Sequence, residues 1–179
     1  NEIFANNENC CLDDFNETED FIEIINLGDE AIDLAGYYFG DMNSGSQIPD
    51  NNPEFTVISP GGLLVLWFDE DPEQGPLHID AKLSSGGETI FAQNAFGEEV
   101  FNISYEPQYE DVSFCSFPDG SDFDVNWLYS ICPTPGYINE NCPFIQGCLD
   151  YNALNYNLEA TFDDGSCIYN PISGIMINE

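Results

Sequence analysis

The chain has 179 residues, of which 34 are acidic and only one is a lysine, giving a formal net charge of −33. A surface this negative repels phosphate backbones and anionic headgroups, which argues against nucleic-acid binding and against electrostatic docking to membranes. No apolar run is long enough to span a bilayer, so membrane insertion is not expected either. With 42% hydrophobic and 14% aromatic residues, the chain still has the means to fold around a core.

Apolar runs of strand length recur between turn sequences rich in glycine, proline, asparagine and aspartate. They are residues 21–25, 31–34, 55–58, 63–68, 89–92, 100–103, 112–117 and 125–129. Short strands spaced in this way are typical of a β-sandwich, and no stretch keeps the period of an amphipathic helix. The sequence therefore predicts an all-β fold with one main core.

Seven cysteines occur without any Cys-x-x-Cys motif. This density indicates disulfides in a secreted or cell-surface protein, and the odd number leaves one thiol over. Cys115 and Cys132 flank strands that a sandwich can bring side by side, so we expect them to pair. Of Cys10, Cys11 and Cys142, we expect one pair to link the opening loop of the sandwich to its exit.

Enzymatic activity is not expected. His78 is the only histidine and no nucleophile motif surrounds it, so a hydrolase triad lacks its components. Carboxylates are so abundant that their presence does not single out an acid–base pair.

The acidic loops predict calcium as a structural cofactor. Calcium takes six to eight oxygen ligands, and carboxylates and amides in such loops supply them. One candidate ligand set is Asp150, Asn152, Asn155, Asn157, Asp163 and Asp164. The other is Asp69, Asp71 and Glu73, spaced as in a calcium loop but without its glycine. The alternative is that these side chains only bond the backbone of local turns. Further acidic residues at 13, 14, 17 and 20 are expected in a solvated loop.

A row of aromatic residues has two possible roles. Exposed on the surface, these side chains would form a glycan-binding platform; placed on strands, they would fill the core, and we favour this second interpretation. They are Tyr37, Tyr38, Phe39, Trp67, Phe68 and Trp127.

Four motifs within residues 1–140 together resemble the bacterial extracellular form of the lamin-tail domain. They are NEIFANN, EDFIEIINLGDEAIDLAGYY, SPGGLLVLWFDEDPEQGPLHIDAKLSSGGETIFAQNAFGEEV, and SFPDGSDFDVNW with its PTPG exit. The resemblance implies an immunoglobulin-like β-sandwich over residues 1–141, without catalytic residues. Such domains are commonly modules of large secreted or surface proteins.

Residues 147–169, GCLDYNALNYNLEATFDDGSCIY, resemble a short Cys-bounded repeat of secreted multidomain proteins from marine bacteria. The resemblance implies a Cys148–Cys167 disulfide that closes a small module over residues 142–169, which is also the first candidate calcium site. Such a loop is worth about 3 kcal/mol of stability.

The two ends of the sequence carry a related motif. Residues 174–179 are GIMINE, and overlaying this Asn-Glu pair on the opening one gives IMINEIFANN, which resembles a complete opening strand of the lamin-tail family. We therefore expect residues 170–179 to be a linker and the first strand of a next unit. The strand residues are Ile175, Met176, Ile177, Asn178 and Glu179.

Together these features predict that the chain is a structural repeat unit of an extracellular fibre, stalk or giant adhesin. Its partners are copies of itself joined head to tail, as a covalent tandem array or as a polymer. The alternatives are an extracellular module that binds glycan or mineral, and an accessory domain of a secreted hydrolase.

Overall fold

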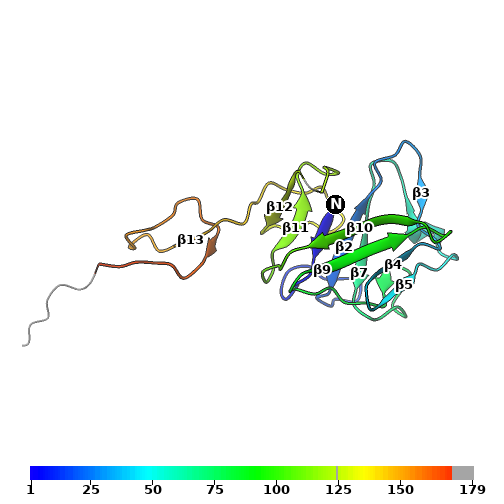
Figure 1. Ribbon diagram of the computed structural model, residues 1–179, viewed down its shortest axis with the longest axis horizontal. Helices are drawn as coiled ribbons and strands as arrows, with labels where there is room; N and C mark the ends of the chain where they lie inside the picture. The colour runs from blue at the N-terminus through cyan, green and yellow to red at the C-terminus, as the bar shows by residue number, and fades with distance from the viewer. Residues whose placement is uncertain (124, 171–179) are drawn as a thin grey trace, which may run out of the picture. The chain divides into compact units, whose positions relative to one another are not determined.

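The computed structural model describes residues 1–123 and 125–170 (Figure 1). The chain divides into two compact units, Asn1–Asn141 and Cys142–Glu179, here called unit 1 and unit 2. The expected inter-unit strand, residues 175–179, lies outside the described residues. Within the described part of the chain, no helix is long and apolar enough to cross a membrane.

Unit 1 is a sandwich of two sheets, which confirms the predicted all-β fold. The larger sheet has the order β12 (Trp127–Ser130), β11 (Ser113–Ser116), β1 (Glu2–Phe4), β2 (Asp20–Ile25), β7 (Leu63–Phe68) and β8 (His78–Ile79). The smaller sheet has the order β10 (Glu99–Tyr105), β9 (Glu88–Gln93), β4 (Tyr38–Asp41) and β5 (Gly45–Gln47). The short strands β3 (Ile32–Asp33) and β6 (Val57–Ile58) form a separate pair. Only β7 and β8 run parallel within the two main sheets as described.

The main core lies between the two sheets. Ile3 and Ile22 of the larger sheet pack in one cluster with Phe39 and Ile90 of the smaller sheet. Because successive side chains of a strand point to opposite faces, the neighbouring residues of β1 and β2 form a second cluster on the other face. This outer cluster consists of Phe4, Phe21, Trp67, Cys11 and Val65. The larger sheet is therefore covered on both faces.

The predicted strands are found with one clear exception. Residues 63–68 form β7 with the predicted bounds, whereas residues 55–58 do not form a continuous strand. Pro53 stands at the start of a short helix, α1 (Pro53–Thr56), where its missing N–H and fixed φ are tolerated. The Thr56 hydroxyl at its end donates a hydrogen bond to Asp33 Oδ1 at 2.6 Å. Only Val57 and Ile58 remain extended, as β6.

Unit 2 has very little core of its own. β13 (Gln146–Gly147) pairs in parallel with β14 (Phe162–Asp163), and the rings of Phe144 and Phe162 are 4.8 Å apart. Cys148 is bonded to Cys167, as predicted. Cys148 and Ala153 are the buried apolar residues of the described part of this unit. The disulfide therefore replaces the core that this unit lacks.

The predicted Cys115–Cys132 disulfide is wrong. Cys115 is free and 1% exposed, whereas Cys132 and Cys142 are both disulfide-bonded. In the β11–β12 ladder Cys115 lies opposite Leu128, so four further residues carry Cys132 about 13 Å along the strand direction. Disulfides need Cα atoms about 4.4–6.8 Å apart. The register of this hairpin therefore separates the two cysteines.

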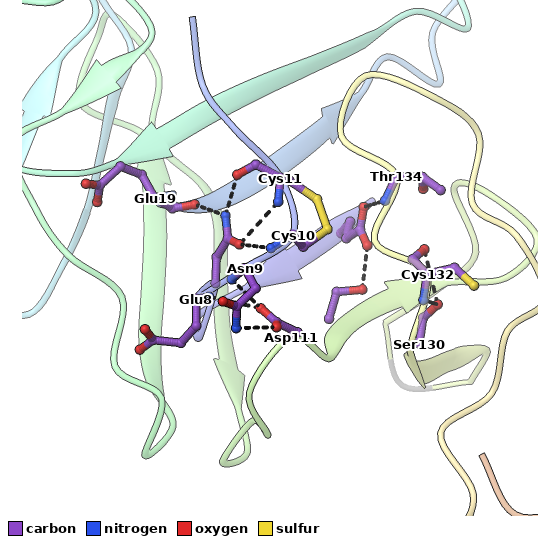
Figure 2. The surroundings of a disulfide bond; sticks show 12 residues. Glu8, Asn9, Cys10, Cys11, Glu19, Asp111, Ser130, Cys132 and Thr134 are labelled. Atoms are coloured by element: carbon purple, nitrogen blue, oxygen red, sulfur yellow. Dashed lines mark hydrogen bonds between the residues drawn. A yellow bond between two sulfur atoms is a disulfide. The ribbon is translucent and has the colours of Figure 1, made fainter. Parts of the chain in front are cut away.

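The expectation that one pair among Cys10, Cys11 and Cys142 links the opening loop to the exit and leaves one cysteine over is also wrong. Cys10 and Cys11 are bonded to each other, and Cys142 is itself disulfide-bonded (Figure 2). Asn7 shapes this turn, since its Oδ1 accepts hydrogen bonds from the N–H groups of both cysteines at 3.3 Å. On the other side, Asp111 accepts hydrogen bonds from the backbone of Asn9 and from its side-chain amide. The chain is thus turned back on itself at residues 7–11, and adjacent sulfur atoms meet.

Thiol counting tests this disulfide pattern. Burial raises the pKa of the Cys115 thiol to about 12, so the native protein should not react with iodoacetamide at pH 8. Unfolding in guanidinium without reductant should then release one reactive thiol per chain, at Cys115. Peptide mapping that finds none, or that finds the label on Cys132 or Cys142, would contradict the pattern.

Candidate functional site

The predicted calcium ligands of unit 2 are engaged in local turns. One carboxylate oxygen of Asp150 accepts a hydrogen bond from the N–H of Asn152, that of Asp163 from Gly165, and that of Asp164 from Ser166. Asn155 bonds the backbone of Ser166 and Ile168 through its amide, and Asn157 accepts a bond from Glu159. In the described residues, Asp150, Asp163 and Asp164 do not gather into one three-carboxylate group.

The second predicted set is divided between two environments. Asp69 is 3% exposed, whereas Glu73 is exposed and Asp71 only half-buried. Asp69 Oδ1 accepts a hydrogen bond from the N–H of Asp71 at 2.9 Å, which makes a turn directly after β7. The other oxygen, Oδ2, contacts Nδ1 of His78. Asp69 therefore faces the single histidine instead of joining Asp71 and Glu73.

The register of the larger sheet explains why Asp69 and His78 meet. β8 pairs in parallel with β7, with Trp67 opposite His78 and Phe68 opposite Ile79. Asp69 follows β7 at once, two residues beyond the partner of His78, and its side chain reaches the His78 ring. Both residues are buried, with His78 5% exposed.

Asp13 is the third member of this group, and its burial corrects the expectation of a solvated loop. It is 8% exposed, and its ligand atoms and those of Asp69 and His78 all lie within 4.8 Å of one another. Its Oδ1 accepts hydrogen bonds from the N–H groups of Phe15 and Glu17, both at 2.8 Å. Its Oδ2 is buried and has no hydrogen-bond partner.

Next to His78 the surface forms a cavity of about 400 Å³. The ring of Phe15 meets the ring of His78 edge-on at 5.5 Å, and Gln74 also lines the cavity. In the sequence, His78 falls within a motif that resembles the lamin-tail family, and Asp13 falls within an acidic segment expected to be solvated. One signal was available, because a lone histidine nine residues after Asp69 stands out in so acidic a chain.

A second polar group is buried where β1 meets β2. Glu2 and Glu23 lie opposite each other and are 0% and 1% exposed. Glu2 accepts hydrogen bonds from the Ser113 hydroxyl and the Thr134 N–H, and Glu23 accepts one from the Gly136 N–H at 2.7 Å. Burial raises the pKa of Glu2 to about 7. The two side chains hold the PTPG exit against the sheet, so their role is structural.

Most residues of the aromatic row pack within unit 1, Trp67 in the outer cluster and Phe39 and Phe68 in the main core. Phe39 and Phe68 are 2% and 1% exposed, Trp67 is 8% exposed, and Tyr37 and Trp127 pack against the main core. Tyr38 is half-buried and stacks on Phe91 at 5.7 Å. Core packing, the favoured interpretation, is therefore confirmed for Phe39, Trp67 and Phe68. Tyr37 and Trp127 are partly buried against the main core, and Tyr38 packs on Phe91 outside both clusters.

No family model matches the chain, and neither the curated proteins nor the solved structures give a match.

Proposed function

We propose that the chain is a structural repeat unit of an extracellular fibre, stalk or large bacterial surface adhesin, joined head to tail. The disulfides suit an oxidising location outside the cytosol, where small units with little core depend on them. The resemblance of unit 1 to lamin-tail domains and of unit 2 to a Cys-bounded repeat supports a module of a large secreted protein.

The observation that carries the proposal is a cavity beside the first residues of β1. β1 lies between β2 and β11, and its pairing with β2 ends at Glu2 and Glu23, although β2 continues to Ile25. A cavity of about 240 Å³ lies there, and most of its lining is apolar. Its walls include Ile24, Ile25, Leu34, Val100 and Phe101. An extension of β1 would pair with the rest of β2 and fill this space.

The sequence of residues 175–177 suits such an extension. In the overlaid motif IMINEIFANN these residues take the three positions ahead of Asn1. Because side chains alternate along a strand, Met176 has the same facing as Ile3, which lies in the main core. Met176 would therefore point into the cavity. A covalent tandem array supplies this strand without displacing Asn1 and Glu2, which already occupy the positions equivalent to Asn178 and Glu179.

An extension of the chain tests this contact. Adding Ile-Met-Ile directly ahead of Asn1 should stabilise unit 1 by about 2 kcal/mol, since it buries at least one large apolar side chain and adds strand hydrogen bonds. The free energy of unfolding in urea measures the change. A Ser-Ser-Ser extension is the matched control and should give little gain. Equal stability of the two extended chains would reject the strand-completion idea.

Calcium belongs to the proposal as a structural ion, because 34 acidic residues face a single lysine. Calcium should raise the melting temperature more than magnesium at equal ionic strength, since magnesium prefers octahedral sites and gives up water reluctantly. Replacing Asp150 and Asp163 by asparagine should remove the difference if unit 2 holds the ion. If both ions shift melting equally in the original chain, the effect is screening alone.

A further inference from the structure

We propose that Asp13, Asp69 and His78 form a binding site for a divalent first-row transition metal such as Zn²⁺, separate from the candidate calcium loop of unit 2. The three residues come from three segments: the loop before β2, the turn after β7, and β8. Their ligand atoms nevertheless lie within 4.8 Å of one another. Ligands at about 2.1 Å from a tetrahedral ion are about 3.4 Å apart, so the more distant atoms must move slightly inward, whereas Nδ1 of His78 and Oδ2 of Asp69, now in direct contact, must move slightly apart.

Asp13 Oδ2 is the observation that points to a ligand. Oδ1 already accepts two backbone N–H groups, which fixes the carboxylate and leaves Oδ2 inside the protein without a donor. Buried polar atoms in proteins almost always have a partner. Asp13, Asp69 and His78 are each more than nine-tenths buried. Two ionised carboxylates this close together in a buried site repel each other unless a positive charge lies between them. A divalent cation satisfies both demands.

The ligand types favour a transition metal over calcium. Imidazole nitrogen suits zinc and its neighbours, whereas calcium takes six to eight oxygens from an open acidic loop. Nδ1 of His78 already faces Asp69 Oδ2, so a metal ion would take the place of the hydrogen bond between these two atoms.

The site also has a route of entry. His78 lines the cavity of about 400 Å³, whose wall includes the exposed residues Asp14 and Phe55. Gln74 lines the same cavity, and among the described residues its Oε1 is the other buried side-chain oxygen without a hydrogen-bond partner. The cavity therefore gives water access to the His78 side of the site, and a water molecule would complete the ligand set.

Calorimetric titration of the untagged, chelator-treated full chain with Zn²⁺ tests the proposal. We expect one saturable site per chain, with binding weakened about 100-fold or more in Asp13→Asn and in His78→Gln. Asp14→Asn removes the same charge from the neighbouring residue and should leave the affinity unchanged. Zinc binding that is absent, or equally strong in all three variants, would overturn the site, because it would reflect surface carboxylates alone.

A spectroscopic measurement on the unaltered chain guards against variants that fail to fold. The chain has one histidine, so a Cu²⁺ probe bound at this site should show nitrogen coupling from a single imidazole in its electron paramagnetic resonance spectrum. A spectrum with oxygen ligands only would overturn the proposal. Neither experiment depends on residues 175–179 or on assembly, so the site stands or falls independently of the proposed function.

Discussion

Replacing Cys148 and Cys167 together by serine is expected to unfold unit 2 while leaving unit 1 folded. The disulfide spans a sequence separation of 19 residues, and closing a loop of that size is worth about 3 kcal/mol. Unit 2 has little with which to offset the loss, since Leu149, Leu154 and Leu158 are exposed in the described structure. Hydrogen exchange should show fast exchange throughout residues 142–170.

The matched control for this double variant is Cys115→Ser, which removes a buried thiol of unit 1 but no disulfide. It should leave exchange in unit 2 unchanged. Retained protection of unit 2 in the Cys148 and Cys167 variant would mean that its short β13–β14 pairing is stable without the bridge. The account of unit 2 as a disulfide-dependent fold would then be wrong.

Replacing Glu2 by glutamine is expected to stabilise unit 1 at pH 8 and to weaken its pH dependence. Burial raises the pKa of Glu2 from 4.5 to about 7, so the folded state keeps a proton that the unfolded chain releases near pH 4.5. This contribution to stability is fully present below about pH 4.5 and is lost as the pH rises through about 7. The loss amounts to about 3 kcal/mol.

Glutamine suits this site because its amide oxygen can accept the hydrogen bond from the Thr134 N–H while its amide nitrogen donates to the Ser113 hydroxyl. The free energy of unfolding at pH 5 and pH 8 measures the effect. Glu30→Gln removes one charge at an exposed position and controls for general repulsion. A pH dependence that remains in Glu2→Gln is expected from Asp20, whose pKa burial also raises to about 7. The same pH dependence in both variants would show that Glu2 titrates alike in the folded and unfolded chain.

Local patterns in the sequence were sufficient for the strands that have clear boundaries. Residues 63–68 form an apolar run between a Gly-Gly turn and an acidic segment, and β7 has these bounds. β4 and β5 were not predicted, because Gly40 and Gly45 interrupt the apolar pattern. In the structure these two glycines lie opposite each other, and a Cβ on either would come within 3.0 Å of backbone atoms of the partner strand.

Features that depend on register or on loop folding were beyond a local pattern. Cys115 and Cys132 are separated by the pairing of Cys115 with Leu128, which only the assembled hairpin defines. The Cys148–Cys167 bridge could be predicted because a resemblance supplied it. Asp13 was misplaced because acidic loop residues are usually solvated, whereas this loop folds over the end of β7 and buries one carboxylate.

The central claim is that residues 175–177 complete the sheet of a following unit. An experimental structure of a two-copy chain, in which residue 177 is followed directly by a second copy beginning at Asn1, tests it most directly. We predict that residues 175–177 extend β1 of the second copy, with Ile177 opposite Ile25 and Met176 opposite Asn26, and that Met176 fills the cavity of about 240 Å³. Residues 175–177 folded back onto their own sandwich, or lying outside the second sheet with the cavity unfilled, would contradict the account.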